Sequence, residues 1–225
     1  MPITIQSHPV DALLQAEIDR WSEIPVAIAV DVSNASCQID PAIRPLCPPG
    51  RQPRLFGRAV TALCEPPDFG AVLQALDLIQ AGDVLVIAAN GHVETAMIGE
   101  ILGGHLRRLG CRGIVCDGAI RDVAQLADWP ELSVFTRAIT PRGPTSMERG
   151  TVNAVVTIGG RLVSPGDLII GDDDGLVALS PFAIRAYIGD AEAKLAREDA
   201  WQRSLADGHA VAAIFGLAPA RRDAL

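Results

Sequence analysis

Apolar residues in the first quarter of the chain follow two different patterns. A helix is predicted over 10–22, because one face of that range collects the apolar residues Val10, Leu13, Leu14, Ile18 and Trp21. The range 26–32, VAIAVDV, is a continuous apolar run of strand length, so we expect a buried strand there. Residues 33–53 are rich in proline and predict a loop with little regular structure.

Strand-like and helix-like patterns alternate from residue 54 to residue 122. Strands are predicted at 54–63, 84–89 and 113–117. Helices are predicted at 69–80 and 99–109, and a short helix is expected after Arg121-Asp122. This alternation is typical of βαβ units, whose strands pair in parallel.

Short β-like runs dominate after Pro130. Gly159-Gly160 predicts a hairpin turn, and the run Asp172–Gly175 predicts a tight acidic turn between two strands, since it lacks the remaining ligands of a calcium loop. Pro181 opens a helix that we expect to reach about Leu205, followed by a weakly specified tail. We therefore predict an α/β fold and one domain over 1–225, with an N-terminal helix within 1–24 and a C-terminal helix and tail over 182–225.

The composition narrows the classes of partner. The 27 acidic residues exceed the 19 lysines and arginines, which gives a net charge of −8 and argues against a general nucleic-acid binder. No segment approaches the roughly 18 apolar residues of a membrane span. The first residues show no basic leader before an apolar run, and the five cysteines are scattered, so we expect a cytoplasmic protein with reduced thiols.

Residues 90–122 hold the most promising chemistry. Gly99 and Glu100 stand where a loop enters a helix, and the first amides of a helix suit a carboxylate or a phosphate. Packing alone also explains Gly99, since Gly103 and Gly104 follow it in the same predicted helix. The glycines do not form a dinucleotide fingerprint.

The pair Arg121-Asp122 follows the predicted strand 113–117. Ligands of open α/β sheets bind beyond the carboxyl ends of strands, where an arginine can hold a carboxylate and an aspartate can ligate a hard divalent cation. A surface arginine beside a helix-capping aspartate is the alternative interpretation. His92 and His105 lack zinc-ligand spacing, so we expect them to be structural or solvent-facing.

The stretch GEILGGHLRRLGCRGIVCDGAIRD resembles the RraA-like family, which includes the class II 4-hydroxy-4-methyl-2-oxoglutarate aldolases. RLFGRAVTAL, GDVLVIAANG, PRGPTS and PGDLIIGDDDGLVALSP also resemble it, so the similarity spans roughly 25–182. The resemblance implies a layered α/β sandwich of the swivelling β/β/α type, assembled as a homotrimer or homohexamer.

The resemblance also implies a pyruvate-type aldolase that depends on Mg²⁺ or Mn²⁺. Asp122 would ligate the metal, Glu100 would hold metal-bound water, and Arg121 would bind the substrate and stabilise the enolate. The pyruvate carboxylate would bind at the backbone amides of the turn formed by Gly99, Glu100, Ile101 and Leu102.

Family members also use a glutamate from the C-terminal helix of a neighbouring subunit, for which Glu198 is the first candidate here and Glu192 the second. Two positions depart from the family pattern. Glu100 stands where many members have aspartate, and Asn34 stands where members often carry aspartate.

The resemblance implies cleavage of a 4-hydroxy-2-oxo acid to a pyruvate enolate, with oxaloacetate decarboxylation as a second activity. A different class of function is also open, because some relatives are non-catalytic regulators that bind ribonuclease E. A methyltransferase has no support, since the chain lacks a glycine-rich cofactor loop.

Overall fold

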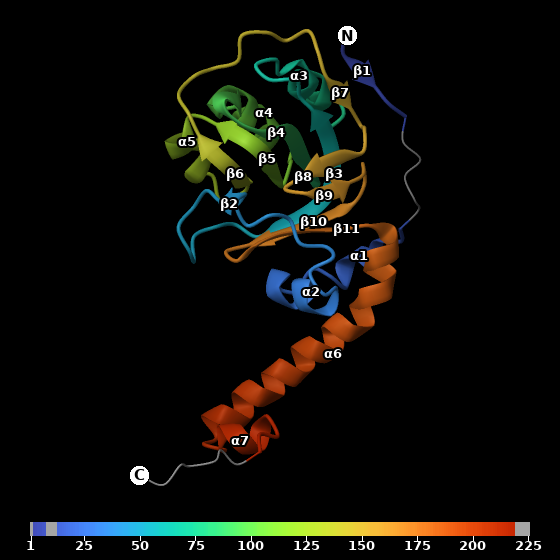
Figure 1. The fold of residues 1–225 in the computed structure, drawn as a ribbon, viewed down its shortest axis with the longest axis vertical. Helices are drawn as coiled ribbons and strands as arrows, with labels where there is room; N and C mark the ends of the chain where they lie inside the picture. Colours follow the sequence, from blue (N-terminus) through green and yellow to red (C-terminus); the bar gives the residue numbers. More distant parts are fainter. Residues whose placement is uncertain (1, 8–12, 219–225) are drawn as a thin grey trace.

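A mixed sheet forms the centre of the protein, as the computed structural model shows (Figure 1). The structure describes residues 2–7 and 13–218, and within these ranges nine strands belong to this sheet. Its middle is parallel and consists of β3 (Leu55–Leu63), β4 (Asp83–Ile98), β5 (Gly113–Ile120) and β6 (Ser133–Ile139). These strands confirm the predicted α/β class.

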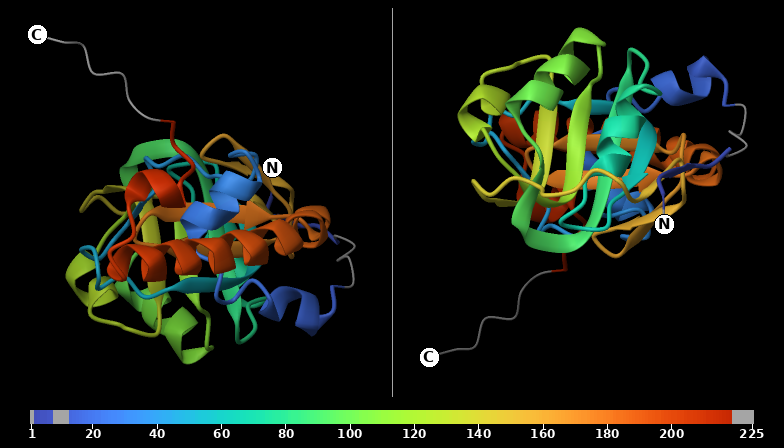
Figure 2. Two further views of the ribbon diagram at one scale, coloured as in Figure 1. Left: turned by 90° about the horizontal axis from the view of Figure 1, so that it is seen from below. Right: turned by 90° about the horizontal axis from the view of Figure 1, so that it is seen from above.

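Three helices connect the parallel strands and cover one face of the sheet (Figure 2). They are α3 (Gly70–Leu76), α4 (Glu100–Arg108) and α5 (Val123–Ala127), and each is close to its predicted place. Their buried residues pack on the sheet in one apolar cluster that includes Val72, Leu106, Ile114 and Leu126. This packing fixes the starts of α4 and α5 against the carboxyl ends of β4 and β5.

Shorter strands extend the sheet. β1 (Thr4–Ile5) and β7 (Thr151–Val152) join its β3 side, while β2 (Arg44–Pro45) pairs with β6. Two hairpins confirm the predicted turns: β8 (Val156–Ile158) with β9 (Arg161–Val163), and β10 (Leu168–Asp172) with β11 (Gly175–Leu179).

The predicted strand at 26–32 is wrong, because this range forms the helix α2 (Val26–Val32). An apolar run has no period that separates a buried strand from a buried helix. Here the Asp172 carboxylate accepts a hydrogen bond from the Val26 amide at 2.9 Å and satisfies a free donor of the first helical turn. Val26, Ile28 and Ala29 then pack against β10, β11 and the last long helix.

The terminal helices lie on the β10–β11 side of the molecule (Figure 1). The described part of the predicted N-terminal helix forms only α1 (Gln15–Asp19), while residues 10–12 lie outside the described ranges. The helix α6 (Pro181–Ala206) confirms the prediction from Pro181, and a short helix, α7 (Val211–Ile214), follows it. None of the helices in the described part of the chain has the length and apolarity to cross a bilayer.

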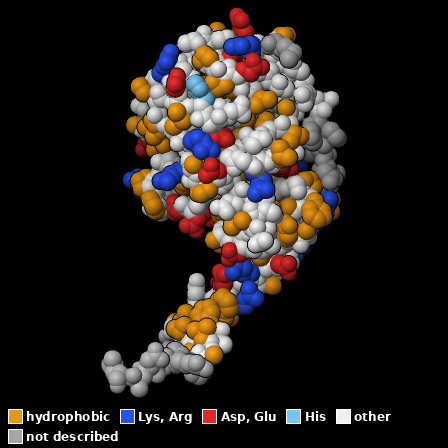
Figure 3. Space-filling view, viewed as in Figure 1, with side chains coloured by type: hydrophobic (Ala, Val, Ile, Leu, Met, Phe, Trp, Pro, Cys, Tyr) orange, Lys and Arg blue, Asp and Glu red, His pale blue; other side chains and the backbone are white. Residues whose placement is uncertain are grey.

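The outer half of α6 leaves the body of the protein (Figure 1). Its buried residues end at Ala191, and beyond them α7 folds back so that the rings of Trp201 and Phe215 lie 4.7 Å apart. Hydrophobic side chains gather at this distal end in the space-filling view (Figure 3). Leu205 and Val211 are exposed there, at 41% and 55%.

Candidate functional site

Gly99, Glu100, Arg121 and Asp122 meet at the carboxyl edge of β4 and β5. The Arg121 amide donates a hydrogen bond to the Ile98 carbonyl at 3.1 Å, which extends the pairing of the two strands by one residue. The structure thus brings the two halves of the predicted segment together. This edge is where ligands bind in open α/β sheets.

The Asp122 carboxylate faces the first turn of α4. Its Oδ2 accepts a hydrogen bond from the Glu100 amide at 3.0 Å, and Arg121 Nε lies 3.5 Å from the same oxygen. Asp122 has a left-handed backbone, with φ of 57°, and its side chain makes no capping bond to α5. Because the Arg121 and Asp122 side chains are 41% and 38% exposed, both remain accessible to a ligand.

Gly99 makes this arrangement possible. A Cβ atom there would overlap the Asp122 carboxylate oxygen and would lie 2.8 Å from Arg121 Cγ. Gly103 allows close helix packing, as the alternative interpretation of these glycines predicted, since a Cβ there would lie 2.6 Å from Leu126 Cδ2 in the α4–α5 contact. The glycines of this segment therefore do both things: Gly99 makes room for the polar pair, and Gly103 lets the helices pack.

A cavity of about 190 Å³ opens beside the pair. Arg121 and Asp122 line it together with Gly99, and most of the remaining wall is apolar, from Phe69, Leu73, Met97, Leu102 and Pro144. Such a pocket, with one cation and one carboxylate among apolar walls, suits a small anionic ligand.

The amides of the α4 start are not all free. The Glu100 amide is bonded to Asp122, and the Gly103 amide is bonded to the Gly99 carbonyl at 2.9 Å. Within residues 2–7 and 13–218, the amides of Ile101 and Leu102 have no acceptor. Of the predicted carboxylate-binding amides, these two are the ones left for an anion.

The buried Asp68 fixes the loop 140–150, which covers one side of the cavity. Burial raises the pKa of this carboxyl, but the Ser146 hydroxyl and three amides donate hydrogen bonds to it and bring its pKa to about 2. The same loop carries Gly143, where a Cβ would lie 2.6 Å from Arg121 Nη1. Sequence reasoning missed Asp68, although a charged residue inside PPDFG is a signal that the chain must satisfy it.

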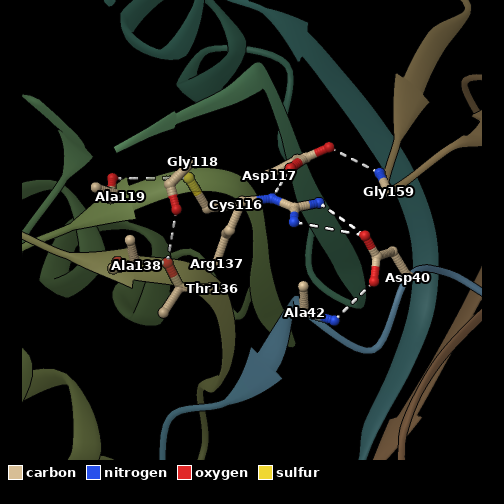
Figure 4. Close-up of polar contacts among 10 residues, drawn as sticks. All are labelled: Asp40, Ala42, Cys116, Asp117, Gly118, Ala119, Thr136, Arg137, Ala138 and Gly159. Atoms are coloured by element: carbon tan, nitrogen blue, oxygen red, sulfur yellow. Dashed lines mark hydrogen bonds and ion pairs between the residues drawn. The ribbon is translucent and has the colours of Figure 1, made fainter. Parts of the chain in front are cut away.

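A second arginine–aspartate pair joins β5 to β6 (Figure 4). Arg137 Nε donates to Asp117 Oδ1 at 2.6 Å, while Asp117 Oδ2 accepts the Gly159 amide at 2.7 Å. Arg137 also reaches Asp40 at 3.4 Å, and these bonds, with that to Asp117 first, raise the pKa of the guanidinium. This network ties β5 and β6 to the β8–β9 turn and to the loop after α2.

The predicted glutamates of α6 do not reach the site of their own chain. Glu198 Oε1 lies 2.8 Å from Lys194 Nζ, and both oxygens of Glu192 accept hydrogen bonds from Arg20. Asn34 stands in the turn after α2, with φ of 49°. Figure 1 shows α2 and α6 on the far side of the sheet from α4.

Carboxylates and imidazoles are sparse around the site. Across the described ranges, no group of three or more His, Cys, Asp and Glu residues is arranged to hold a metal ion. His92 Nε2 lies 2.7 Å from Thr95 Oγ1 in the irregular part of β4, and His105 lies within α4. That both are structural or solvent-facing stays a prediction. A cation at the site would thus have one or two protein carboxylates, Asp122 and Glu100.

Comparison with known proteins identifies relatives by sequence. The profile of the RraA-like family, described as Aldolase/RraA, matches residues 19–178. A protein of Halalkalibacterium halodurans named "Putative 4-hydroxy-4-methyl-2-oxoglutarate aldolase" is 31% identical over 198 residues, which cover 86% of this chain and 91% of that protein.

Two solved structures resemble the fold. An uncharacterized protein from Pseudomonas syringae pv. tomato matches with a TM-score of 0.78 and 21% identity, over 91% of this chain and 99% of that one. The RNA-processing inhibitor RraA from Thermus thermophilus matches with a TM-score of 0.62 and 27% identity, over 70% of this chain and 93% of that one.

Proposed function

The chain belongs to the RraA-like family, and we propose that it is a metal-dependent lyase that cleaves 4-hydroxy-2-oxo acids of the 4-hydroxy-4-methyl-2-oxoglutarate type to pyruvate. One observation carries the proposal: the Asp122 carboxylate and the Arg121 guanidinium stand half-exposed at the mouth of a small, mostly apolar cavity. The aldolase name of the relative that is 31% identical supports it.

Arg121 has the chemistry to bind the substrate and to stabilise the product of cleavage. Breaking the C3–C4 bond of the substrate leaves negative charge on the keto oxygen of an enolate, while a base takes the proton of the C4 hydroxyl, which becomes a carbonyl. Protonation of the enolate at C3 then gives pyruvate. A guanidinium that is already positioned to donate hydrogen bonds to this oxygen stabilises the charge as it develops. The free amides of Ile101 and Leu102 suit the adjacent carboxylate.

The donor set fits a divalent metal of the Mg²⁺ type. Mg²⁺ is usually held by one or two carboxylates and completes its shell with water and substrate oxygens, so it needs no cluster of three protein ligands. Asp122 would be the direct ligand, because one of its oxygens has no bond to the protein in the described residues, and Glu100 would be the nearby second carboxylate. The bound cation would supply Lewis acidity at the keto oxygen.

The same arrangement suits oxaloacetate. Decarboxylation also leaves a pyruvate enolate, but it needs no base for a hydroxyl group. We therefore include oxaloacetate decarboxylation in the proposal as a second activity.

A homotrimer or homohexamer would bring α6 to the site of a neighbouring copy. The outer half of α6 projects from its own body, and its distal end exposes apolar side chains (Figures 1 and 3). Glu198 is the better candidate to complete that site, because one of its oxygens is unbonded in the described residues while both oxygens of Glu192 are held by Arg20.

Mixing the inactive variants Asp122→Ala and Glu198→Ala should restore activity in mixed oligomers. No recovery, with mixed oligomers confirmed by native mass spectrometry, would contradict the shared site.

The direct test is pyruvate release from a panel of 4-hydroxy-2-oxo acids and oxaloacetate, with Mg²⁺, with Mn²⁺ and with EDTA. We expect release from at least one substrate, no activity with EDTA, and recovery when the metal is restored. Absence of pyruvate from the whole panel in the presence of either metal would contradict the proposal.

A regulator of RNA processing is the second candidate, favoured by the likeness to the Thermus thermophilus inhibitor. Such a protein would bind ribonuclease E through its surface, and the Arg121-Asp122 pair would be dispensable. Pull-down of ribonuclease E by the wild type and by Asp122→Ala, together with inhibition of RNA cleavage, tests this candidate.

A further inference from the structure

The loop 140–146 carries one more arginine, Arg142, whose main chain lies next to the wall of the cavity. The Arg142 carbonyl accepts a hydrogen bond from the Ala96 amide at 2.8 Å, and Ala96 belongs to the cavity wall. The next residue, Gly143, packs against the Arg121 guanidinium, and Pro144 lines the cavity. The main chain at Arg142 is therefore fixed beside the site, independently of its side chain.

Arg142 differs from Arg137 and Arg149, the neighbouring arginines, because it has no ion-pair partner in the described residues. Arg149 lies 3.9 Å from Asp68 and 3.7 Å from Glu65, and Arg137 is bonded to Asp117. The Arg142 side chain is exposed and has no hydrogen bond or ion pair with any residue in 2–7 or 13–218. In a chain of net charge −8, this positive charge beside a cavity is free to meet an anion.

The cavity itself offers charged partners to only one half of a substrate. Its polar side chains are Arg121 and Asp122, while the walls formed by Phe69, Leu73 and Pro144 offer no partner to a second carboxylate. Burying an unpaired carboxylate against such walls is costly. A second carboxylate would therefore have to lie outside these apolar walls, and Arg142 is a cation, unpaired among the residues that the structure describes, whose main chain is held beside them.

We propose that Arg142 binds the far carboxylate of a dicarboxylic 4-hydroxy-2-oxo acid and so makes the site selective for dicarboxylic over monocarboxylic substrates. The inference rests on the proposed lyase function, and it adds a residue that recognises the half of the substrate that does not become the pyruvate enolate. An arginine can hold a carboxylate by two parallel hydrogen bonds, which lysine does not reproduce in full.

The test compares wild type, Arg142→Ala and Arg142→Lys in the metal-loaded full chain. Arg112→Ala is the matched control, because Arg112 is an exposed arginine at the opposite end of β5 from the site. For each variant, KM and kcat are measured with 4-hydroxy-4-methyl-2-oxoglutarate and with the monocarboxylic 4-hydroxy-2-oxopentanoate. Inhibition by oxalate, which imitates the pyruvate enolate, reports the inner half of the site without turnover.

Arg142→Ala should raise KM for the dicarboxylic substrate by about 10- to 100-fold, the usual range for loss of a hydrogen bond to a charged group. It should change kcat, oxalate inhibition and the monocarboxylic KM by less than about 2-fold, since the lost bond concerns only the far carboxylate. Arg142→Lys should recover part of the affinity, and Arg112→Ala should behave as wild type.

An equal effect on both substrates and on oxalate, or no effect on any, would overturn the role of Arg142 while leaving the lyase intact. A wild type that releases no pyruvate from either substrate would overturn both the lyase and this inference.

Discussion

Two arginine–aspartate pairs, one joining β5 to β6 and one just beyond the end of β5, differ in how far their hydrogen-bonding capacity is used. In the Arg137–Asp117 pair the atoms lie 2.6 Å apart, the Asp117 side chain is 8% exposed, and its second oxygen is held by Gly159. In the Arg121–Asp122 pair the atoms lie 3.5 Å apart, and both side chains are more than a third exposed. The first pair is saturated and joins parts of the fold, whereas the second retains capacity for a ligand.

The difference follows from position along the strand. Asp117 lies inside β5, where its side chain is enclosed by the β8–β9 turn and the loop after α2 (Figure 4). Arg121 and Asp122 lie just beyond the end of β5, where the left-handed backbone of Asp122 aims its carboxylate at α4. An identical pair of residue types is therefore structural within the strand and available for chemistry at its end.

The largest expected effect comes from Asp122→Asn. Asparagine tolerates the left-handed backbone and can still accept the Glu100 amide, so only the charge is lost. Loss of a metal ligand worth several kcal/mol should lower kcat/KM for pyruvate release by about a thousandfold. Thermal unfolding, followed alongside, should show a Tm close to that of the wild type, and activity above a tenth of wild type would contradict the assignment.

The next effect concerns the close approach at Gly99. Gly99→Ala should displace the Arg121-Asp122 pair, because the added Cβ would overlap the carboxylate, and a misplacement of this kind costs about a hundredfold in rate. Gly104→Ala is the matched control in α4, since its Cβ would lie 3.4 Å from Trp129, in ordinary contact. The measurement is the steady-state rate of both variants. Equal rates would mean that the close contact of Gly99 with the Arg121-Asp122 pair has no functional role.

Asp117→Asn breaks the Arg137–Asp117 pair, and it should lower stability while leaving activity unchanged. Breaking a buried ion pair costs about 3 kcal/mol, which for a chain of this size lowers Tm by roughly 10 °C. Below its Tm the variant should keep a wild-type kcat. Asp40→Asn, at a side chain 43% exposed, should cost less than about 1 kcal/mol. Calorimetry gives the Tm and steady-state kinetics give kcat for each variant. If kcat of Asp117→Asn fell together with its Tm, Asp117 would have a catalytic role.

A smaller effect than that of Asp117→Asn is expected from Asp68, a third carboxylate that is saturated in the same manner as Asp117. Its folded pKa of about 2 lies below the unfolded value of about 3.9, so its contribution of about 2 kcal/mol is present above pH 4 and is lost as the pH falls toward 2. The unfolding free energies of wild type and Asp68→Asn should therefore converge over this window. A constant difference from pH 6 to pH 2 would contradict the low pKa.

Sequence patterns predicted the elements that have one clear period or a strong boundary residue. The strand 113–117 and the helix after Pro181 are where they were expected, and the glycine pair at 159–160 is a hairpin turn. The range 26–32 was predicted wrongly, because an all-apolar run carries no period and its helical form depends on Asp172, far along the chain. β4 continues to Ile98, although Asn90 and Gly91 have positive φ, because the strand resumes pairing after a bulge.

The candidate site was predictable only in part. Arg121, Asp122 and Gly99 were identified from a contiguous segment, and the fold brings them together as a parallel βαβ unit must. Asp68 escaped notice because the Ser146 hydroxyl that bonds it is 78 residues away in the sequence. Arg142 escaped notice because its closeness to the cavity depends on the bond of its carbonyl to Ala96, and a single sequence does not show such contacts. Glu198 stays a prediction, since its proposed partners lie on another copy of the chain.

The most direct measurement is a titration of the full chain with Mn²⁺, followed by the electron paramagnetic resonance signal of the free ion, for wild type, Asp122→Asn and Asp117→Asn. If the pair at the end of β5 is the open one, wild type and Asp117→Asn should bind one Mn²⁺ per chain with similar affinity, and Asp122→Asn should lose this binding. Unchanged binding by Asp122→Asn, or loss of binding by folded Asp117→Asn, would contradict the account.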